Sequence, residues 1–325
     1  PINSATFSSD GTKILLAASS DGAYLMDCKF GNPVSHIKEK NFLKSAIFSP
    51  DDKKILTTSW DKEARLWDSS SGALIGGFEG HSENINSSVS SAIYSPDSTK
   101  ILTASWYSVR LWDSNSGALI HSLDGHNSYI NSAIFSPDGK SILTTADEDS
   151  TALLWECESG KIIRKFRMSF DEDAMIVNDI LFKDQASAIF SSDGSKVFTF
   201  YTNSGQIWDT DSGALICSLD DCSGFNDYGL FSPNDDLLLL FGGDDIDNMW
   251  DSKNGKLITY MPGHIDNVNS AVFSPDGKSI LTVSDDRTAR VWKVPTEPFV
   301  YAKRWAIDLS SSSSLPSPDT SLLTL

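Results

Sequence analysis

A thirteen-residue segment that recurs along the chain is the feature that most constrains the fold. The sequence SAIFSPDGKSILT spans residues 132–144, and SAVFSPDGKSILT spans residues 270–282. Five more divergent copies complete a set of seven and start at Ser4, Ser45, Ser91, Ser187 and Tyr228. A catalytic motif has no reason to be copied, because one active site needs one nucleophile or one base. The copies therefore indicate a repeated structural unit.

A second landmark follows each copy at a nearly constant distance. It is a short apolar segment such as ARLWD or VRLWD, and in six units it ends in tryptophan followed by one acidic or basic residue. These tryptophans are Trp67, Trp112, Trp155, Trp208, Trp250 and Trp292, and Met26 takes the place in the first unit. Successive landmarks are 41, 45, 43, 53, 42 and 42 residues apart. The period of the repeat is therefore about 40–45 residues.

Each unit is predicted to form four short strands. SAIF is an apolar strand, SPDG supplies proline and glycine for a tight reversal, and KSILT is the second strand. A polar loop leads to the third strand, ARLW, and the pair SG turns the chain into a fourth strand, ALI. No segment has sustained helical periodicity. A four-stranded sheet of this size cannot bury both of its faces alone, so we expect the sheets to pack face to face.

This pattern resembles the WD-repeat family, in which Gly-His precedes the first strand and Trp-Asp closes the third. Four of the landmark tryptophans are followed by aspartate, and the chain has three Gly-His pairs, at Gly80-His81, Gly125-His126 and Gly263-His264. The resemblance covers residues 2–295 and implies an all-β, seven-bladed β-propeller of four-stranded antiparallel blades. We assign residues 1–309 to this domain, with an insertion at 169–185, and expect the serine-rich tail 310–325 to be disordered. The segment FVYAKRW (299–305) is the candidate fourth strand of the last blade.

Histidine, hydroxyl and acidic residues in the last two-thirds of the chain raise the question of catalysis. His264, Thr282 and Asp286 are residue types of a nucleophilic triad. The resemblance implies instead that they form a buried structural tetrad with Trp292. The fourth unit has a similar set, made of His126, Asp149, Trp155 and either Thr144 or Thr145, and the second unit has a partial one, made of Thr57, Asp61 and Trp67. Because an active site seldom occurs in degraded copies, we predict a non-enzymatic protein with no catalytic residue, cofactor or metal.

Charge and cysteine content restrict the partners. The chain has 26 basic and 44 acidic residues, a formal net charge of -18, which argues against nucleic acids and anionic membranes as partners. No apolar stretch is long enough to span a bilayer, and no signal-peptide pattern opens the chain. The four cysteines have no disulfide-framework spacing. We therefore expect a cytoplasmic, monomeric propeller with reduced thiols.

Function in a repeat protein is expected where the copies diverge, because shared positions are committed to packing. The loop before the tetrad aspartate contains Trp60 in the second unit, and Trp106 and Tyr107 in the third, where the aspartate is lost. These rings either fold back over a neighbouring blade or are exposed anchors of an interface. The resemblance adds positions that contact partners in the family, and by register these are Phe42, Tyr129, Asn131, Phe225, Asn267 and Asn269.

We hypothesise that Phe42, Trp60, Trp106 and Tyr129 form one aromatic patch on three consecutive blades. Acidic neighbours such as Asp61 favour a partner with lysine or arginine around an apolar anchor. The sequence therefore predicts a non-catalytic scaffold that binds a protein or peptide in an assembly or adaptor role. The alternative is a propeller that binds a carbohydrate or small ligand, because tryptophan rings also stack on sugars.

Overall fold

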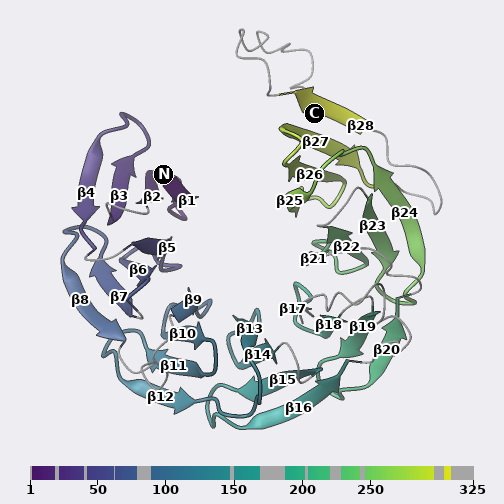
Figure 1. Cartoon of the computed structure of the whole chain (residues 1–325), viewed down its shortest axis with the longest axis horizontal. Helices are drawn as coiled ribbons and strands as arrows, with labels where there is room; N and C mark the ends of the chain where they lie inside the picture. Colours follow the sequence, from purple (N-terminus) through teal and green to yellow (C-terminus); the bar gives the residue numbers. More distant parts are fainter. Residues whose placement is uncertain are drawn as a thin grey trace, which may run out of the picture. The chain divides into compact units, whose positions relative to one another are not determined.

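The computed structural model describes residues 2–18, 22–39, 42–61, 63–78, 89–146, 150–168, 187–201, 204–219, 228–241, 246–295 and 304–308. Within these ranges the regular structure consists of strands, and they form seven four-stranded antiparallel sheets. We number the sheets blade 1 to blade 7 in chain order. Figure 1 shows the four strands of each blade following one another along the chain. The all-β prediction with seven such blades is confirmed.

The first strands contain the predicted segments, but in blades 1, 2, 3, 4 and 7 they begin two residues earlier than the repeated segment. Blade 1 consists of β1 (Ile2–Phe7), β2 (Lys13–Ala18), β3 (Gly22–Asp27) and β4 (Pro33–Ile37). Blade 2 consists of β5 (Leu43–Phe48), β6 (Lys54–Ser59), β7 (Ala64–Asp68) and β8 (Leu74–Phe78). Blade 3 consists of β9 (Val89–Tyr94), β10 (Lys100–Ser105), β11 (Val109–Asp113) and β12 (Leu119–Ser122). Blade 4 consists of β13 (Ile130–Phe135), β14 (Ser141–Ala146), β15 (Thr151–Glu156) and β16 (Ile162–Arg167).

The remaining three blades repeat the same order. Blade 5 consists of β17 (Ser187–Phe190), β18 (Lys196–Tyr201), β19 (Ser204–Asp209) and β20 (Leu215–Ser218). Blade 6 consists of β21 (Tyr228–Phe231), β22 (Leu237–Phe241), β23 (Ile246–Asp251) and β24 (Leu257–Pro262). Blade 7 consists of β25 (Val268–Phe273), β26 (Ser279–Ser284), β27 (Thr288–Lys293) and β28 (Arg304–Asp308).

The fourth strand of blade 7 lies slightly further along the chain than predicted. β28 pairs with β27 from Thr288↔Asp308 to Trp292↔Arg304. It therefore shares only its first two residues with the expected segment 299–305, of which residues 299–303 lie outside the described ranges. The expected insertion at 169–185 and the tail at 310–325 also lie outside them.

The chain divides into two compact units, Pro1–Leu215 and Ile216–Leu325, with the boundary inside β20. In the first unit consecutive blades pack on each other through their first and second strands, and in the second unit β22 packs on β25. In blades 2, 3, 4, 5 and 7 the landmark tryptophan packs in the interface with the blade before it. Trp67 packs against Leu15 and Leu25 of blade 1, and Trp292 packs against Leu239 and other residues of blade 6. Burial of such a ring stabilises the fold by about 1.5–3 kcal/mol, which explains why this position repeats.

The SPDG segments form the tight turns that the sequence predicts. In blade 4 the Ser136 hydroxyl donates to Asp138 at 2.7 Å and accepts from the backbone N–H of Ser141 at 2.9 Å. Gly139 has φ +70°, which favours glycine. The same place in three blades without this glycine is taken by other residues that keep the left-handed conformation, namely Asp52, Ser98 and Asp235. The turn is therefore held by its side-chain hydrogen bonds as much as by glycine.

Two equivalent turns between third and fourth strands are expected to differ in how well they tolerate an added methyl group. Gly117 and Gly255 occupy equivalent turns with φ +71° and +70°. A Cβ on Gly117 would meet no atom within 4 Å, whereas one on Gly255 would lie 2.2 Å from the carbonyl oxygen of Ser218. We expect Gly117→Ala to cost about 1–2 kcal/mol and Gly255→Ala to cost about 1–3 kcal/mol more. Urea unfolding of both variants measures the difference, and equal midpoints would contradict this close backbone approach.

Candidate functional site

The tetrad of blade 7 is a closed hydrogen-bond chain rather than an accessible triad. The Trp292 indole donates to the Thr282 hydroxyl at 2.9 Å, and that hydroxyl lies 2.7 Å from His264 Nε2. His264 Nδ1 lies 2.9 Å from an Asp286 carboxylate oxygen, so Nδ1 carries the proton that this oxygen accepts. The histidine and aspartate side chains are each 1% exposed. A group enclosed in this way cannot reach a substrate, and its role is to satisfy buried polar atoms.

The environment of Asp286 favours its charged form. Burial by itself would raise the pKa of this carboxyl, but hydrogen bonds from Thr288, His264 and the Ile265 backbone outweigh burial and hold the pKa well below its usual range. Arg290 adds a hydrogen bond from Nη2 at 3.2 Å. Blade 7 is therefore stabilised by a carboxylate that must stay ionised.

This lowered pKa predicts a pH dependence of stability. The stabilisation by Asp286 is complete above the ordinary aspartate pKa of 3.8 and is lost as the pH falls from there towards the lower pKa of the folded state. We expect Asp286→Asn to lower the free energy of unfolding by about 2–3 kcal/mol at neutral pH. Urea unfolding should show the difference between wild type and variant shrinking below about pH 4. A difference that stays constant with pH would contradict this role.

The link between tryptophan and threonine recurs in four more blades. The indole nitrogen lies 2.7–2.9 Å from the threonine hydroxyl in the pairs Trp67–Thr57, Trp112–Thr103, Trp155–Thr144 and Trp208–Thr199. In blade 4, Thr144 rather than Thr145 is the member, and His126 joins it at 2.7 Å. Asp149, the expected fourth member, lies outside the described residues. These repeats mark the tetrad positions as part of the scaffold.

Blade 6 lacks this hydrogen bond. Leu240 occupies the threonine position, and the buried Trp250 Nε1 has no hydrogen-bond partner among the residues that the structure describes. Replacing Trp250 by phenylalanine removes an unsatisfied donor, whereas replacing Trp292 removes a formed bond to Thr282. We therefore expect Trp292→Phe to destabilise the protein by about 1–2 kcal/mol more than Trp250→Phe. Denaturant unfolding of the two variants tests this, and a larger cost for Trp250→Phe would contradict it.

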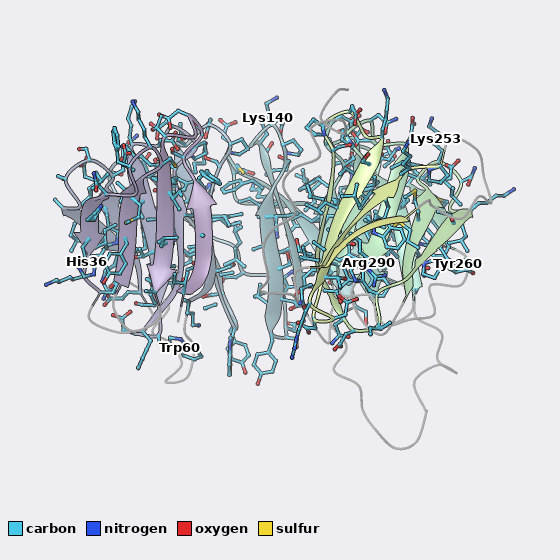
Figure 2. The ribbon with its side chains drawn as sticks, turned by 90° about the horizontal axis from the view of Figure 1, so that it is seen from above. His36, Trp60, Lys140, Lys253, Tyr260 and Arg290 are labelled. Carbon is cyan, nitrogen blue, oxygen red and sulfur yellow. The ribbon has the colours of Figure 1, made fainter. Side chains whose placement is uncertain are left out.

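An exposed aromatic pair extends from blade 2. Trp60 follows β6 and Phe42 precedes β5, and their side chains are 64% and 62% exposed. The backbone N–H of Trp60 donates to the Phe42 carbonyl at 3.0 Å, which fixes the two segments side by side. Figure 2 shows Trp60 projecting from the end of the sheets opposite to Lys140. We call Phe42 and Trp60 the Trp60 pair.

A lysine already covers one ring of this pair. The Lys44 ammonium lies 4.4 Å from the centroid of the Trp60 ring, within cation–π distance. Burial lowers the pKa of Lys44. The Trp60 ring is therefore able to make a cation–π contact with an ammonium group.

A second aromatic group joins blades 3 and 4. Trp106 and Tyr107 follow β10, and Tyr129 precedes β13. The Trp106 and Tyr129 ring centroids lie 5.5 Å apart at 84°, and those of Tyr107 and Tyr129 lie 4.8 Å apart. The Ile130 N–H donates to the Trp106 carbonyl at 2.8 Å and links the two blades. We call these three rings the Trp106 cluster.

The rings of the Trp106 cluster lean on each other and still face solvent. Trp106, Tyr107 and Tyr129 are 44%, 48% and 41% exposed. The Trp60 pair and the Trp106 cluster occupy equivalent places in their blades, at the entry to the first strand and after the second. In antiparallel sheets both places lie at the same end, and blades 2, 3 and 4 pack in succession. The two groups therefore lie on one face of the first unit, which we call the aromatic face.

The other predicted contact residues divide into three cases. Asn131 is exposed on β13, beside the Trp106 cluster. Asn267 and Asn269 are exposed in the second unit, where Asn269 donates to Asp285 at 2.6 Å and the Asp285 N–H donates to the Asn267 carbonyl at 3.0 Å. Phe225 lies outside the described residues. The candidate surface of the first unit is thus formed by Phe42, Trp60, Trp106, Tyr107, Tyr129 and Asn131.

One polar residue near this surface was missed from the sequence. Glu39 accepts from the Thr57 hydroxyl at 2.5 Å, in the place that histidine takes in blades 4 and 7. In all three blades this residue stands 18 positions before the threonine. The separation of 18 residues from the threonine is therefore the sequence signal for Glu39, because a Gly-His pattern does not include a glutamate.

The described residues contain no group of three or more His, Cys, Asp or Glu that could hold a metal ion. In the same ranges no helix is long and apolar enough to cross a membrane. Cys28 and Cys157 are free thiols, and burial raises the pKa of Cys157 to about 11. Such a thiol is unreactive and packs as a small apolar side chain.

Comparison with known proteins agrees with this architecture. Residues 31–68, 72–113, 117–156 and 255–293 match the family model "WD domain, G-beta repeat". The zebrafish (Danio rerio) guanine nucleotide-binding protein subunit beta-5b is 30% identical over 252 residues, which are 78% of this chain and 50% of that protein. The mouse (Mus musculus) apoptotic protease-activating factor 1 is 28% identical over 167 residues, which are 49% of this chain and 13% of that protein.

A solved structure supports the fold alone. The crystal structure of the computationally designed Ika8 protein has a TM-score of 0.73 and 17% identity, and the match covers 90% of this chain and 83% of that one. The fold class is that of the seven-bladed β-propellers. The chain belongs to the WD-repeat family. It spans at most half the length of the two natural relatives named above.

Proposed function

We propose that this chain is a non-catalytic scaffold that binds a protein or peptide on its aromatic face, in an assembly or adaptor role. The observation that carries the proposal is the exposure of five aromatic rings at one end of three consecutive blades, while the tetrad side chains are enclosed. Rigid aromatic rings supply much contact area at a low cost in side-chain entropy, and they are enriched among the residues that dominate binding energy. The proposal includes a cytoplasmic, monomeric protein.

The charge of this face favours a basic partner. Arg65 of blade 2 is surrounded by the three carboxylates of Glu39, Asp61 and Glu63, which leaves a net negative charge beside the Trp60 pair. The whole chain has a net charge of -18. A partner that places lysine or arginine beside an apolar anchor would be attracted by this charge and could stack on the rings.

The test uses matched removal of exposed rings. Trp60→Ala combined with Trp106→Ala removes one ring from each aromatic group. The control is Phe30→Ala, because Phe30 is 69% exposed and has Lys29 at 5.1 Å from its ring, but follows β3 and so lies at the other end of blade 1. We expect wild-type protein to enrich peptides with lysine or arginine beside an apolar residue from a random heptapeptide library. The double variant should lose affinity for the best peptide by about tenfold or more, and Phe30→Ala by less than about twofold.

The possible outcomes separate the two candidate functions. Binding that weakens with rising ionic strength, as measured by titration calorimetry, supports the basic partner. Competition by free monosaccharides together with loss in the double variant would favour the carbohydrate-binding alternative. Peptide affinity that is unchanged in the double variant would remove the aromatic face from consideration.

A further inference from the structure

The tetrad positions of blade 2 carry different residue types from those of blade 7. In blade 7 the His264 ring links the two sides of the tetrad, because Nδ1 donates to Asp286 and Nε2 lies 2.7 Å from the Thr282 hydroxyl. In blade 2 the corresponding pair is Glu39 and Asp61, and two carboxylates cannot hydrogen-bond to each other when both are ionised. A donor has to stand between them, and the structure supplies a guanidinium from the third strand.

Arg65 of β7 takes this bridging place. Its Nη1 donates to Glu39 Oε2 at 2.8 Å and to the Ser59 hydroxyl at 3.1 Å. Its Nη2 donates to Asp61 Oδ2 at 2.5 Å and to Glu63 Oε2 at 2.6 Å. The side chains of Glu39, Arg65 and Asp61 are 1%, 12% and 15% exposed, so the network is largely protected from water. Such charge-assisted bonds are stronger than bonds between neutral groups.

Three partners of Arg65 lie close to the exposed Trp60 along the chain. Ser59 is the last residue of β6, Asp61 and Glu63 belong to the loop between β6 and β7, and Trp60 lies between Ser59 and Asp61. The Ser59 hydroxyl also donates to Asp61, which closes the loop on itself. Glu39 is the anchor on the other side, because it is tied to the Trp67 indole through Thr57. The buried end of the network is therefore joined to the loop that presents Trp60.

The equivalent arginine of blade 7 does not have this role. Arg290 donates from Nη2 to Asp286 at 3.2 Å and from Nε to Thr288 at 3.1 Å, while His264 makes the central link. The residue before Asp286 is Asp285, where blade 2 has Trp60. Blade 2 thus combines the exchange of histidine for glutamate with a loop that presents an exposed tryptophan.

We propose that Glu39, acting through Arg65, is a positioning residue that fixes the Trp60 ring on the aromatic face. This proposal rests on the proposed function, because a fixed ring raises affinity only if Trp60 contacts a partner. A ring held before binding does not have to be ordered during binding, so affinity is gained without a new contact. Without the buried acceptor, Arg65 loses its link to Glu39, and the loop keeps its bonds to Arg65 and the backbone bond from Trp60 to Phe42 but is no longer tied to the interior through Glu39.

The experiment observes the ring directly. Protein labelled with 5-fluorotryptophan gives a ¹⁹F resonance for Trp60, which is assigned by its absence in Trp60→Phe. In Glu39→Leu this resonance should shift and sharpen towards that of a mobile tryptophan, while the Trp106 resonance stays in place. Glu39→Gln keeps an acceptor for Arg65 and should retain the wild-type signal. His264→Leu, the matched change in blade 7, should lower stability and leave the Trp60 signal unchanged.

The outcomes decide the proposal even when one variant does not fold. An unchanged Trp60 resonance in folded Glu39→Leu would overturn it. If Glu39→Leu does not fold, Arg65→Lys replaces it, because lysine keeps the charge and lacks the planar fork. The Trp60 resonance must then shift in Arg65→Lys, and an unchanged resonance would again overturn the proposal.

A binding measurement links the positioning role to function. For the best heptapeptide selected on wild-type protein, Glu39→Leu should weaken affinity by about three- to tenfold, and should add almost nothing in a Trp60→Ala background. Additive losses in the two backgrounds would show that Glu39 acts on binding by another route and would contradict the proposal. If no peptide binds wild type, the proposed function fails, whereas the ¹⁹F result still decides whether Glu39 positions Trp60.

Discussion

Each blade has two apolar faces, and a four-stranded sheet cannot cover either of them with its own residues. Within each compact unit neighbouring blades cover these faces, and the repeated tryptophan fills the interface with the preceding blade, as Trp67 does against Leu15 and Leu25. The indole brings a polar N–H into this apolar layer, and that donor needs a partner. Threonine supplies the partner in five blades. The packing of sheet on sheet therefore determines both the tryptophan and the hydrogen bond that accompanies it.

Because these positions are needed for packing, few positions on the blades are left for binding residues. The residues that fill interfaces and close tetrads cannot change without cost to stability, so binding residues are restricted to loops and strand entries at the ends of the blades. On the first unit these places present the Trp60 pair and the Trp106 cluster. Blade 2 also shows that a tetrad can vary without being lost. A glutamate and an arginine replace the histidine there, and the same bonds that satisfy the interior hold the loop that presents Trp60.

Prediction from the sequence succeeded where repetition supplied independent copies of one register. The first strands, the SPDG turns and the link from Trp292 to Thr282 and His264 all follow from positions that recur at fixed spacing. It failed where a residue had no copy. Glu39 stands at the histidine position in an unrelated chemical form, and the choice between Thr144 and Thr145 stayed open until their pairing was known. For Trp60 the sequence left two alternatives open, an exposed ring and a ring folded over a neighbouring blade.

The sequence by itself determined the number of blades, their four-stranded order and the enclosed tetrad of blade 7, because period and register depend on local strand and turn preferences that each copy repeats. Tertiary structure alone decided how residues of different blades meet. Tyr129 contacts Trp106 and Tyr107 across a blade boundary, and Arg65 gathers Glu39 from before blade 2 with carboxylates from a loop inside it. Such contacts depend on the distance and angle between packed elements, and no periodicity along one chain encodes them.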